Sequence, residues 1–271
     1  MMNIDVWLER SRQQLKMVGI STARLDALVL LEDVTGHDRA WLLAHGEHKL
    51  SSTEIAKLTK LLSRRATHEP LAYLRKKTEF YGREFIITPS VLEPRPESET
   101  MIDCLKNLPK LPKTIKIADV GTGSGALGIT VKLELPQTQV ELLEIDSGAL
   151  KIAQMNVDKY TADVAVISSD LLAGSRQDNN VLLCNLPYVP DSHKVNQAAS
   201  HEPRIAIFGG PDGLDIYRQL FAQIKKLQKR PLFILTESLP PQHAALANIA
   251  ASAEYKLVET DDLIQVFGQQ L

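Results

Sequence analysis

The residues with the most evident chemistry are Asn185, Leu186, Pro187 and Tyr188, which follow a short apolar run at 181–184. Such a run is typical of a buried strand. Pro187 has no N–H and restricts the residue before it to extended conformations, so we expect a stiff bend where this strand ends. Amide and carbonyl oxygens in that bend accept hydrogen bonds from an –NH₂ group, and an aromatic ring stacks on its plane. Taken alone, the four residues are explained equally well by an ordinary turn.

A glycine-rich segment forms a second candidate site. An expected strand at 115–120 contains Asp119 near its end, and an expected helix begins at 126. The turn between them consists of Gly121, Thr122, Gly123, Ser124 and Gly125. Such a turn brings backbone N–H groups and a helix N-terminus close to a ligand. Glu144 lies about twenty residues further on, at the end of the next expected strand, where an acid binds the hydroxyls of a ribose. The spacing suits both a nicotinamide dinucleotide and S-adenosylmethionine.

Three features favour S-adenosylmethionine. Asp119 stands just before the turn, where a carboxylate would repel a pyrophosphate but can bind the cationic amino-acid end of S-adenosylmethionine. Asp170, after the third expected strand, offers an acceptor for an adenine amino group. The end of the chain predicts an antiparallel hairpin, which departs from the all-parallel sheet of dinucleotide-binding domains.

Repeated strand–helix alternation from residue 115 predicts an α/β fold with a Rossmann-like, doubly wound sheet. The expected strands lie at 115–120, 140–145, 164–168, 181–184 and 232–236, with a terminal hairpin of 255–260 and 263–267. In such a sheet the fourth strand lies beside the first. The bend at Asn185 then lies next to the glycine-rich turn, at the topological switch point where ligands bind. A methyl donor beside an acceptor for –NH₂ indicates methyl transfer to a planar nitrogen.

The apolar periodicity before residue 70 is helical and predicts main helices at 3–18, 21–34 and 51–66. Ser21 is the expected N-cap of the second helix, and Ser51 with Glu54 has the spacing of a capping box. We expect a helical docking domain at 1–70, a β-hairpin (80–87) with a linker at 71–96, and a methyltransferase domain at 97–271. Arg95, between two prolines of the linker, is a candidate substrate contact, and an ion pair with a nearby acid is its alternative role.

Composition limits the class of protein. The 271 residues carry a net charge of -2 with a pI near 6.4, so no global basic field points to a nucleic-acid backbone. Cys104 and Cys184 are far apart in apolar contexts, which indicates a reducing compartment, no disulfide framework and no metal site. The start does not resemble a signal peptide, and no apolar run approaches the ~20 residues of a membrane span. We expect a monomeric cytoplasmic protein.

These segments resemble a known family. Residues 119–125 and 185–188 are similar to class I methyltransferases that act on exocyclic or amide nitrogens. Segments 24–28, 44–47, 93–99 and 201–214 resemble the release factor glutamine N5-methyltransferases, the PrmC/HemK family. The resemblance runs in order over nearly the whole chain and combines several independent motifs.

The resemblance implies methylation of the glutamine amide in the Gly-Gly-Gln loop of bacterial peptide chain release factors. The 121–125 turn, Glu144 and the stretch around Leu171 would hold S-adenosylmethionine, with Asn185 bordering it. Asn185 through Tyr188 would hold the glutamine, and the helical domain would help to dock the release factor. Two departures stand out: Leu186 where the family usually has proline, and Glu93 where it has an apolar residue.

We expect catalysis from Asn185 Oδ1 and the Leu186 carbonyl as hydrogen-bond acceptors, with Tyr188 packing on the amide plane. The main alternative is an adenine-N6 methyltransferase acting on ribosomal RNA or DNA, because Asn-Leu-Pro-Tyr also occurs in ribosomal RNA adenine-N6 dimethyltransferases. The acidic pI and the N-terminal position of the helical domain argue against it. A non-catalytic cofactor-binding module, inactivated by Leu186, is the third hypothesis.

Overall fold

The computed structural model describes residues 2–109, 111–112 and 114–270, which divide into two compact units. The N-terminal unit comprises the chain up to Lys76 together with Val195–His201. The C-terminal unit comprises Lys77–Lys194 and the chain from Glu202 onward.

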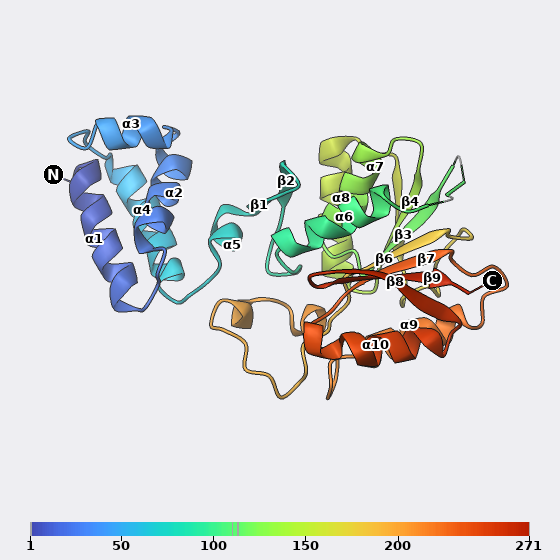
Figure 1. The fold of residues 1–271 in the computed structure, drawn as a ribbon. Helices are drawn as coiled ribbons and strands as arrows, with labels where there is room; N and C mark the ends of the chain where they lie inside the picture. Colours follow the sequence, from blue (N-terminus) through green and yellow to red (C-terminus); the bar gives the residue numbers. More distant parts are fainter. Residues whose placement is uncertain (1, 110, 113, 271) are drawn as a thin grey trace. The chain divides into compact units, whose positions relative to one another are not determined.

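The N-terminal unit is a helical bundle (Figure 1). Its helices are α1 (Ile4–Met17), α2 (Ala23–Thr35), α3 (Arg39–Ala44), α4 (Ser52–Arg65) and the short α5 (Leu71–Arg75). The expected capping box is confirmed, since Ser51 and Glu54 exchange side-chain-to-backbone hydrogen bonds at the start of α4. Ser21 as the N-cap of α2 is wrong: Thr22 holds that position and its side chain makes no cap hydrogen bond. Helix α2 is instead held by its core face, where Ala27, Leu30 and Leu31 are fully buried.

The C-terminal unit is built on a seven-stranded sheet in the order β5-β4-β3-β6-β7-β9-β8. The strands are β3 (Lys116–Val120), β4 (Gln139–Glu144), β5 (Val164–Ser168), β6 (Val181–Cys184), β7 (Phe233–Glu237), β8 (Tyr255–Asp261) and β9 (Ile264–Gln269). The five strands from β5 to β7 are parallel, and β9 joins β7 antiparallel. The predicted α/β fold, the terminal hairpin and the pairing of β6 with β3 are confirmed.

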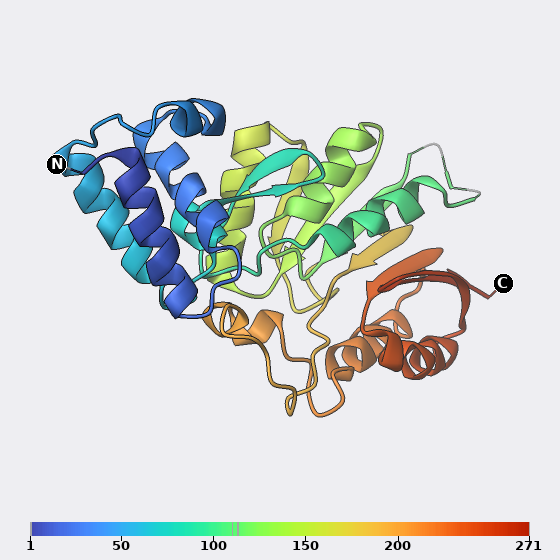
Figure 2. The same cartoon turned by 60° about the vertical axis from the view of Figure 1, so that its left-hand side comes forward.

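Helices cover both faces of this sheet (Figure 2). One face is covered by α6 (Glu99–Lys106), α7 (Ala126–Glu134) and α8 (Ser147–Tyr160), and the other by α9 (Asp215–Ile224) and α10 (His243–Ala251). Buried side chains of β3 alternate between the two cores, with Ile117 on one face and Ala118 and Val120 on the other. The sheet is therefore covered by apolar side chains on both faces, as a parallel sheet requires.

A separate two-stranded hairpin precedes the large sheet. It consists of β1 (Lys77–Phe80) and β2 (Arg83–Ile86), joined at Tyr81 and Gly82, both with positive φ. This confirms the hairpin with Gly82 at its turn, although its first strand begins three residues earlier than predicted. The chain then reaches the short helix η1 (Pro96–Ser98), which leads into α6.

The long segment between β6 and α9 contains only the short helices η2 (Ala199–His201) and η3 (Arg204–Ala206). The helix expected at 213–228 is shorter, because Gly213 has a φ of 82° and the chain turns again after Ile224. Among the described residues, no helix has the length and apolarity to cross a membrane, and no cluster of His, Cys, Asp and Glu could hold a metal ion.

Candidate active site

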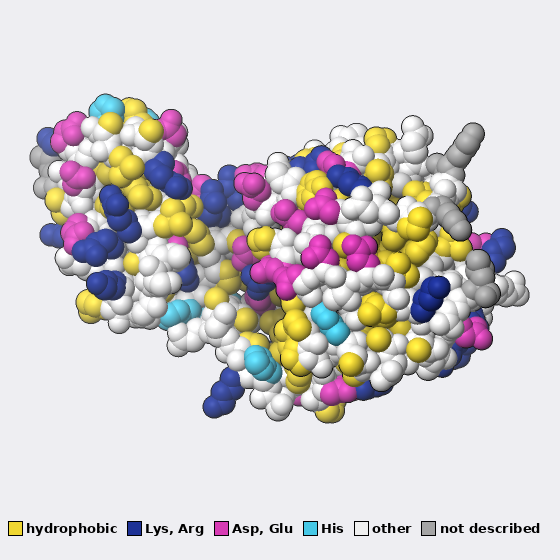
Figure 3. Space-filling model, viewed as in Figure 1, with side chains coloured by type: hydrophobic (Ala, Val, Ile, Leu, Met, Phe, Trp, Pro, Cys, Tyr) yellow, Lys and Arg dark blue, Asp and Glu magenta, His cyan; other side chains and the backbone are white. Residues whose placement is uncertain are grey.

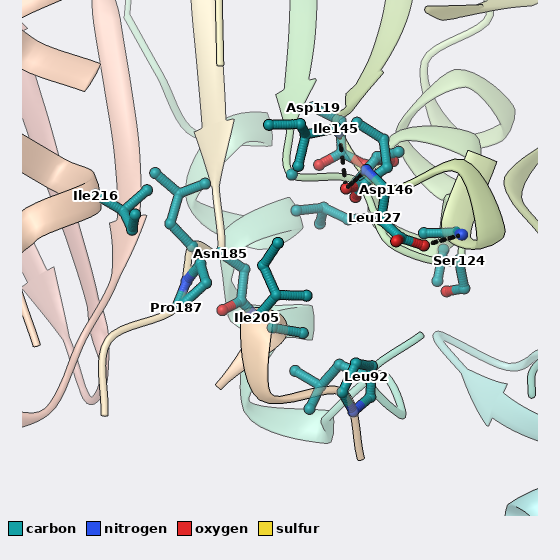
Figure 4. Close-up of a pocket in the computed structure, with 18 of the residues that line it drawn as sticks. Leu92, Asp119, Ser124, Leu127, Ile145, Asp146, Asn185, Pro187, Ile205 and Ile216 are labelled. Carbon is teal, nitrogen blue, oxygen red and sulfur yellow. Dashed lines mark hydrogen bonds between the residues drawn. The ribbon is translucent and has the colours of Figure 1, made fainter. Parts of the chain in front are cut away.

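A cavity of about 360 Å³ opens at the carboxyl ends of β3, β4, β5 and β6. This edge contains the topological switch point, because the chain leaves β3 to β4 on one side and returns to β6 on the other. Asn185, Pro187 and Ile205 lie on one side of the cavity, and Ile145, Asp146 and Ser124 on the opposite side (Figure 4). The sequence-predicted residues found in its lining are Asp119, Gly121, Thr122, Ser124, Glu144, Asp170, Leu171, Asn185, Leu186 and Pro187.

Asp119, at the end of β3, holds the glycine-rich turn and the start of α7 by hydrogen bonds. Its Oδ2 accepts hydrogen bonds from the Thr122 hydroxyl (2.5 Å) and from the Gly128 N–H (2.9 Å) in α7. The side chain is 2% exposed, and this burial raises its pKa from 3.8 to about 6, against the opposing effect of the two hydrogen bonds. A cation in the cavity would stabilise the charged form of this carboxylate.

Glu144 holds the turn from the neighbouring strand. One carboxylate oxygen accepts the Gly123 N–H, and the other accepts the N–H groups of Ile145 and Asp146, all at 2.9 Å. Three of the roughly four lone-pair positions of the carboxylate are thus used inside the protein. The fourth lone-pair position leaves room for one further hydrogen bond. A ribose has two hydroxyl groups to bind, so it would need a second acceptor nearby.

Asp146 supplies such an acceptor, and the sequence reasoning missed it. It is the N-cap of α8, with Oδ1 bound to the Ala149 N–H at 2.8 Å, and it lines the cavity. The signal was present, since an acid two residues after Glu144 and just before a helix is a common N-cap. Ile145 was missed as well; it is 56% exposed and lines the cavity.

Ser169, Asp170 and Leu171 close the cavity beyond the end of β5. Leu171 has a positive φ of 51°, and the Ser169 hydroxyl donates a hydrogen bond to its carbonyl at 2.6 Å. The exposed Asp170 lines the same cavity as the apolar Leu171 and Ile145, a set of side chains that suits a flat ring with an amino group at its edge.

The bend after β6 is packed tightly against the glycine-rich turn. The Leu186 side chain is 2% exposed, and a Cβ atom placed on Gly121, whose φ is +70°, would lie 2.9 Å from Leu186 Cδ2. The Leu186 side chain therefore fills the space beside Gly121, where a residue with a Cβ atom would be crowded.

The carbonyl groups of the bend differ in availability. The Cys184 carbonyl accepts the Tyr217 hydroxyl at 2.8 Å, and the Tyr188 carbonyl accepts the Gln242 amide at 2.7 Å. None of the described residues donates a hydrogen bond to the Leu186 carbonyl or to Asn185 Oδ1. These two oxygens are free acceptors, and the Asn185 and Pro187 backbone carbonyls likewise have no donor among the described residues.

Glu237 and Ser98 are the most important residues that the sequence reasoning missed. Glu237 ends β7 with 1% exposure, and it accepts hydrogen bonds from the hydroxyls of Ser98 (2.5 Å) and Tyr188 (2.9 Å). Burial raises the pKa of Glu237, and these hydroxyls partly oppose that effect. Ser98 Oγ in turn accepts the Asn185 amide at 2.7 Å. No local pattern could have revealed this set, because its members lie up to 139 positions apart.

Four of the predicted residues do not contribute to the cavity lining: Arg95, Gly123, Gly125 and Tyr188. Gly123 binds Glu144 through its N–H, and Gly125 precedes α7. Arg95 forms an ion pair with the buried Glu202 at 2.7 Å, the alternative that the sequence had left open. Tyr188 is directed to Glu237, and burial raises its pKa.

Both parts of the chain match known protein families. Residues 6–75 match the PrmC N-terminal domain, and residues 97–202 match the methyltransferase small domain. A release factor glutamine methyltransferase of Coxiella burnetii is 36% identical over 83% of this chain and 82% of its own length. One from Koribacter versatilis is 34% identical over 82% of this chain and 81% of its own.

Solved structures show the same fold at low identity. A methyltransferase from Pyrococcus furiosus aligns with a TM-score of 0.52 and 14% identity, covering 82% of this chain and 100% of its own. The hMettl16 catalytic domain aligns with a TM-score of 0.55 and 14% identity over 81% of this chain and 82% of its own.

Proposed function

Because the chain belongs to the family of release factor glutamine methyltransferases, we propose that it methylates the glutamine of the Gly-Gly-Gln loop in bacterial peptide chain release factors. The methyl group would come from S-adenosylmethionine and go to the side-chain amide nitrogen, N5. The observation that carries the proposal is the pair of free acceptors, Asn185 Oδ1 and the Leu186 carbonyl, on the same cavity as the glycine-rich turn and Glu144.

The lining of the cavity fits S-adenosylmethionine. Glu144 and Asp146 offer acceptors for a ribose, while Ile145, Leu171 and Asp170 form an apolar surface with a polar edge for adenine. The buried carboxylate of Asp119 suits the cationic end of the molecule. A cavity of this volume lies within the usual range for ligand sites, about 300–1,000 Å³. When bound, S-adenosylmethionine supplies an electrophilic methyl group.

The residues of the bend provide what an amide acceptor needs. An amide nitrogen is a weak nucleophile because its lone pair is delocalised into the carbonyl. Asn185 Oδ1 and the Leu186 carbonyl can accept its two hydrogens, hold the nitrogen at near-attack distance and stabilise positive charge that develops on it. Of the described residues, no His, Cys or Lys lines the cavity, so positioning by acceptors is the chemistry that the site offers.

The N-terminal helical unit would contribute to docking of the release factor, and the reaction would take place in the cytoplasm with the enzyme as a monomer. An adenine-N6 activity on RNA or DNA is less well supported. On the face of the C-terminal unit shown in Figure 3, Lys and Arg side chains are scattered among Asp and Glu, without a continuous basic field. A nucleic-acid backbone would be bound by such a field.

The test is incubation of the protein with isotopically labelled S-adenosylmethionine and unmodified release factor, followed by mass spectrometry of the peptides. We expect one methyl group on the glutamine of the Gly-Gly-Gln loop. A release factor with alanine in place of that glutamine is the matched control and should stay unlabelled. Parallel reactions with ribosomal RNA test the alternative, since label on adenine would replace the proposal. No label on either substrate would favour a non-catalytic module.

A further inference from the structure

A directional chain of hydrogen bonds runs from the bend to the end of β7. The Asn185 amide donates from Nδ2 to Ser98 Oγ (2.7 Å), and the Ser98 hydroxyl donates to Glu237 Oε2 (2.5 Å). This chain of hydrogen bonds connects three separate elements: the bend after β6, the end of η1 and the end of β7. Ser98 and Asn185 line the cavity, whereas Glu237 does not.

The donors around Glu237 determine the direction of this chain. Ser98 and Tyr188 each aim a hydroxyl at the carboxylate. A carboxylate accepts both, because in the ionised form it carries no proton of its own. The Ser98 hydroxyl donates its single hydrogen to Glu237, so its oxygen can only accept a hydrogen bond from the Asn185 amide. The reverse order would place two acceptor oxygens 2.5 Å apart in the core, where an unsatisfied polar group is costly.

The direction of the chain decides which atom Asn185 presents to the cavity. The two ends of an asparagine side chain have nearly the same shape, so an isolated asparagine can turn its oxygen or its nitrogen toward a ligand. With Nδ2 committed to Ser98, only Oδ1 remains for the ligand. The ligand group at this position must therefore be a hydrogen-bond donor.

We propose that Ser98 and Glu237 are positioning residues that fix Asn185 with Oδ1 toward the acceptor substrate, and that they thereby select an amide –NH₂ over a carboxylate. The proposal rests on the proposed function and deepens it. A glutamine and a glutamate side chain are nearly identical in shape. Glutamate would place an oxygen against Oδ1 and against the Leu186 carbonyl, whereas glutamine donates to both. Discrimination between glutamine and glutamate then depends on the buried chain of hydrogen bonds and not on the size of the pocket.

The test measures discrimination directly. The dissociation constants of full-length release factor and of its variant with glutamate in the Gly-Gly-Gln loop are measured by calorimetry, with S-adenosylhomocysteine present so that no transfer occurs. In Ser98→Ala the Asn185 amide can rotate and offer Nδ2 to the carboxylate. We expect the preference for glutamine over glutamate to fall about tenfold or more, and kcat/KM for methylation to fall about 10- to 100-fold.

The matched control is Ser238→Ala. Ser238 follows Glu237 directly, is fully buried, and its hydroxyl has no hydrogen-bond partner among the described residues. This variant removes the same hydroxyl from the same neighbourhood without interrupting the chain, so it should keep the wild-type preference. Thermal unfolding and the affinity for S-adenosylmethionine are measured for both variants. They show whether Ser98→Ala has lost packing or cofactor binding instead.

The isosteric variant Glu237→Gln provides a second route if Ser98→Ala does not fold. A carboxamide can accept from Ser98 or donate to it, so both directions of the chain become available and the preference should again fall. A wild-type preference in a folded Ser98→Ala protein, or in Glu237→Gln where only that variant folds, would overturn the proposal. Failure of the wild-type protein to methylate the release factor is a different result, and it would instead refute the proposed function.

Discussion

Two buried glutamates are held in different ways: Glu144 lines the cavity, whereas Glu237 binds Ser98 and Tyr188 without lining it. Glu144, at the end of β4, accepts three backbone N–H groups from the turn and the start of α8. Glu237, at the end of β7, accepts two side-chain hydroxyls. The cofactor side is thus organised by main-chain groups, which every residue except proline possesses. The acceptor side depends on particular side chains at distant positions, so it should respond more sharply to substitutions outside the ligand contacts.

The largest effect is expected on the acceptor side. Asn185→Ala removes the side-chain acceptor of the bend, and kcat should fall about 1,000-fold, as for the loss of a group that stabilises developing charge. The affinity for S-adenosylmethionine, measured by calorimetry, should stay within about tenfold, or 1.4 kcal/mol. Turnover close to that of the wild type would show that the bend does not hold the substrate nitrogen.

Glu144→Ala should have the opposite profile. It removes the acceptor of three backbone N–H groups and of a ribose hydroxyl, so binding of S-adenosylmethionine should weaken by roughly 1–3 kcal/mol. At saturating cofactor kcat should remain within about tenfold of wild type, because the acceptors of the bend are intact. An unchanged dissociation constant in calorimetry would contradict a role for Glu144 on the cofactor side.

Asp119 is held in a mixed manner, by one hydroxyl and one backbone N–H, and its burial makes it sensitive to pH. Its folded pKa of about 6 exceeds the ordinary 3.8, so the folded state binds the proton more tightly than the unfolded state. The stabilisation is complete below the unfolded value and is lost as pH rises through about 6. Without ligand, the free energy of unfolding should therefore be about 1–2 kcal/mol higher near pH 5 than near pH 7.5 from this group.

Chemical denaturation at the two pH values measures that difference. The Asp119→Asn variant is the control, because it keeps an acceptor oxygen but does not titrate. Subtracting its pH dependence removes the contributions of other acids with raised pKa values, such as Glu202 and Glu237. Equal slopes for both proteins would mean that Asp119 is ionised in the folded state well below pH 6.

The smallest effect is expected from Leu186→Pro. Proline keeps the free carbonyl, so kcat/KM should stay within about threefold of wild type. It loses part of the side chain packed near Gly121, and unfolding should become easier by about 1 kcal/mol. Thermal unfolding and steady-state kinetics together test both expectations. A large loss of kcat/KM would show that the leucine side chain itself takes part in binding.

The same division between main chain and side chain explains what the sequence could predict. The glycine-rich turn, the acid at 144 and the order of the strands follow from local patterns, and the structure has the turn, the acid and β6 beside β3 as expected. Asp146 and Ile145 were within reach of the same reasoning. Ser98 and Glu237 were not, because a serine before a helix predicts only an N-cap and a glutamate at a strand end only a polar edge residue, so neither pattern pairs the two. Their role depends on tertiary contacts over 87 and 139 positions.

The direction of the hydrogen bonds from Asn185 through Ser98 to Glu237 also limits which substitutions the protein can accept during evolution. Each link is useful only while the next link accepts its hydrogen, so substitutions at these positions should not act additively. Once Ser98 is lost, a change at Glu237 should have little further effect on glutamine selection, and a change at either position is expected to require a compensating one at the other. The three positions form an epistatic unit, which related sequences should keep or exchange together.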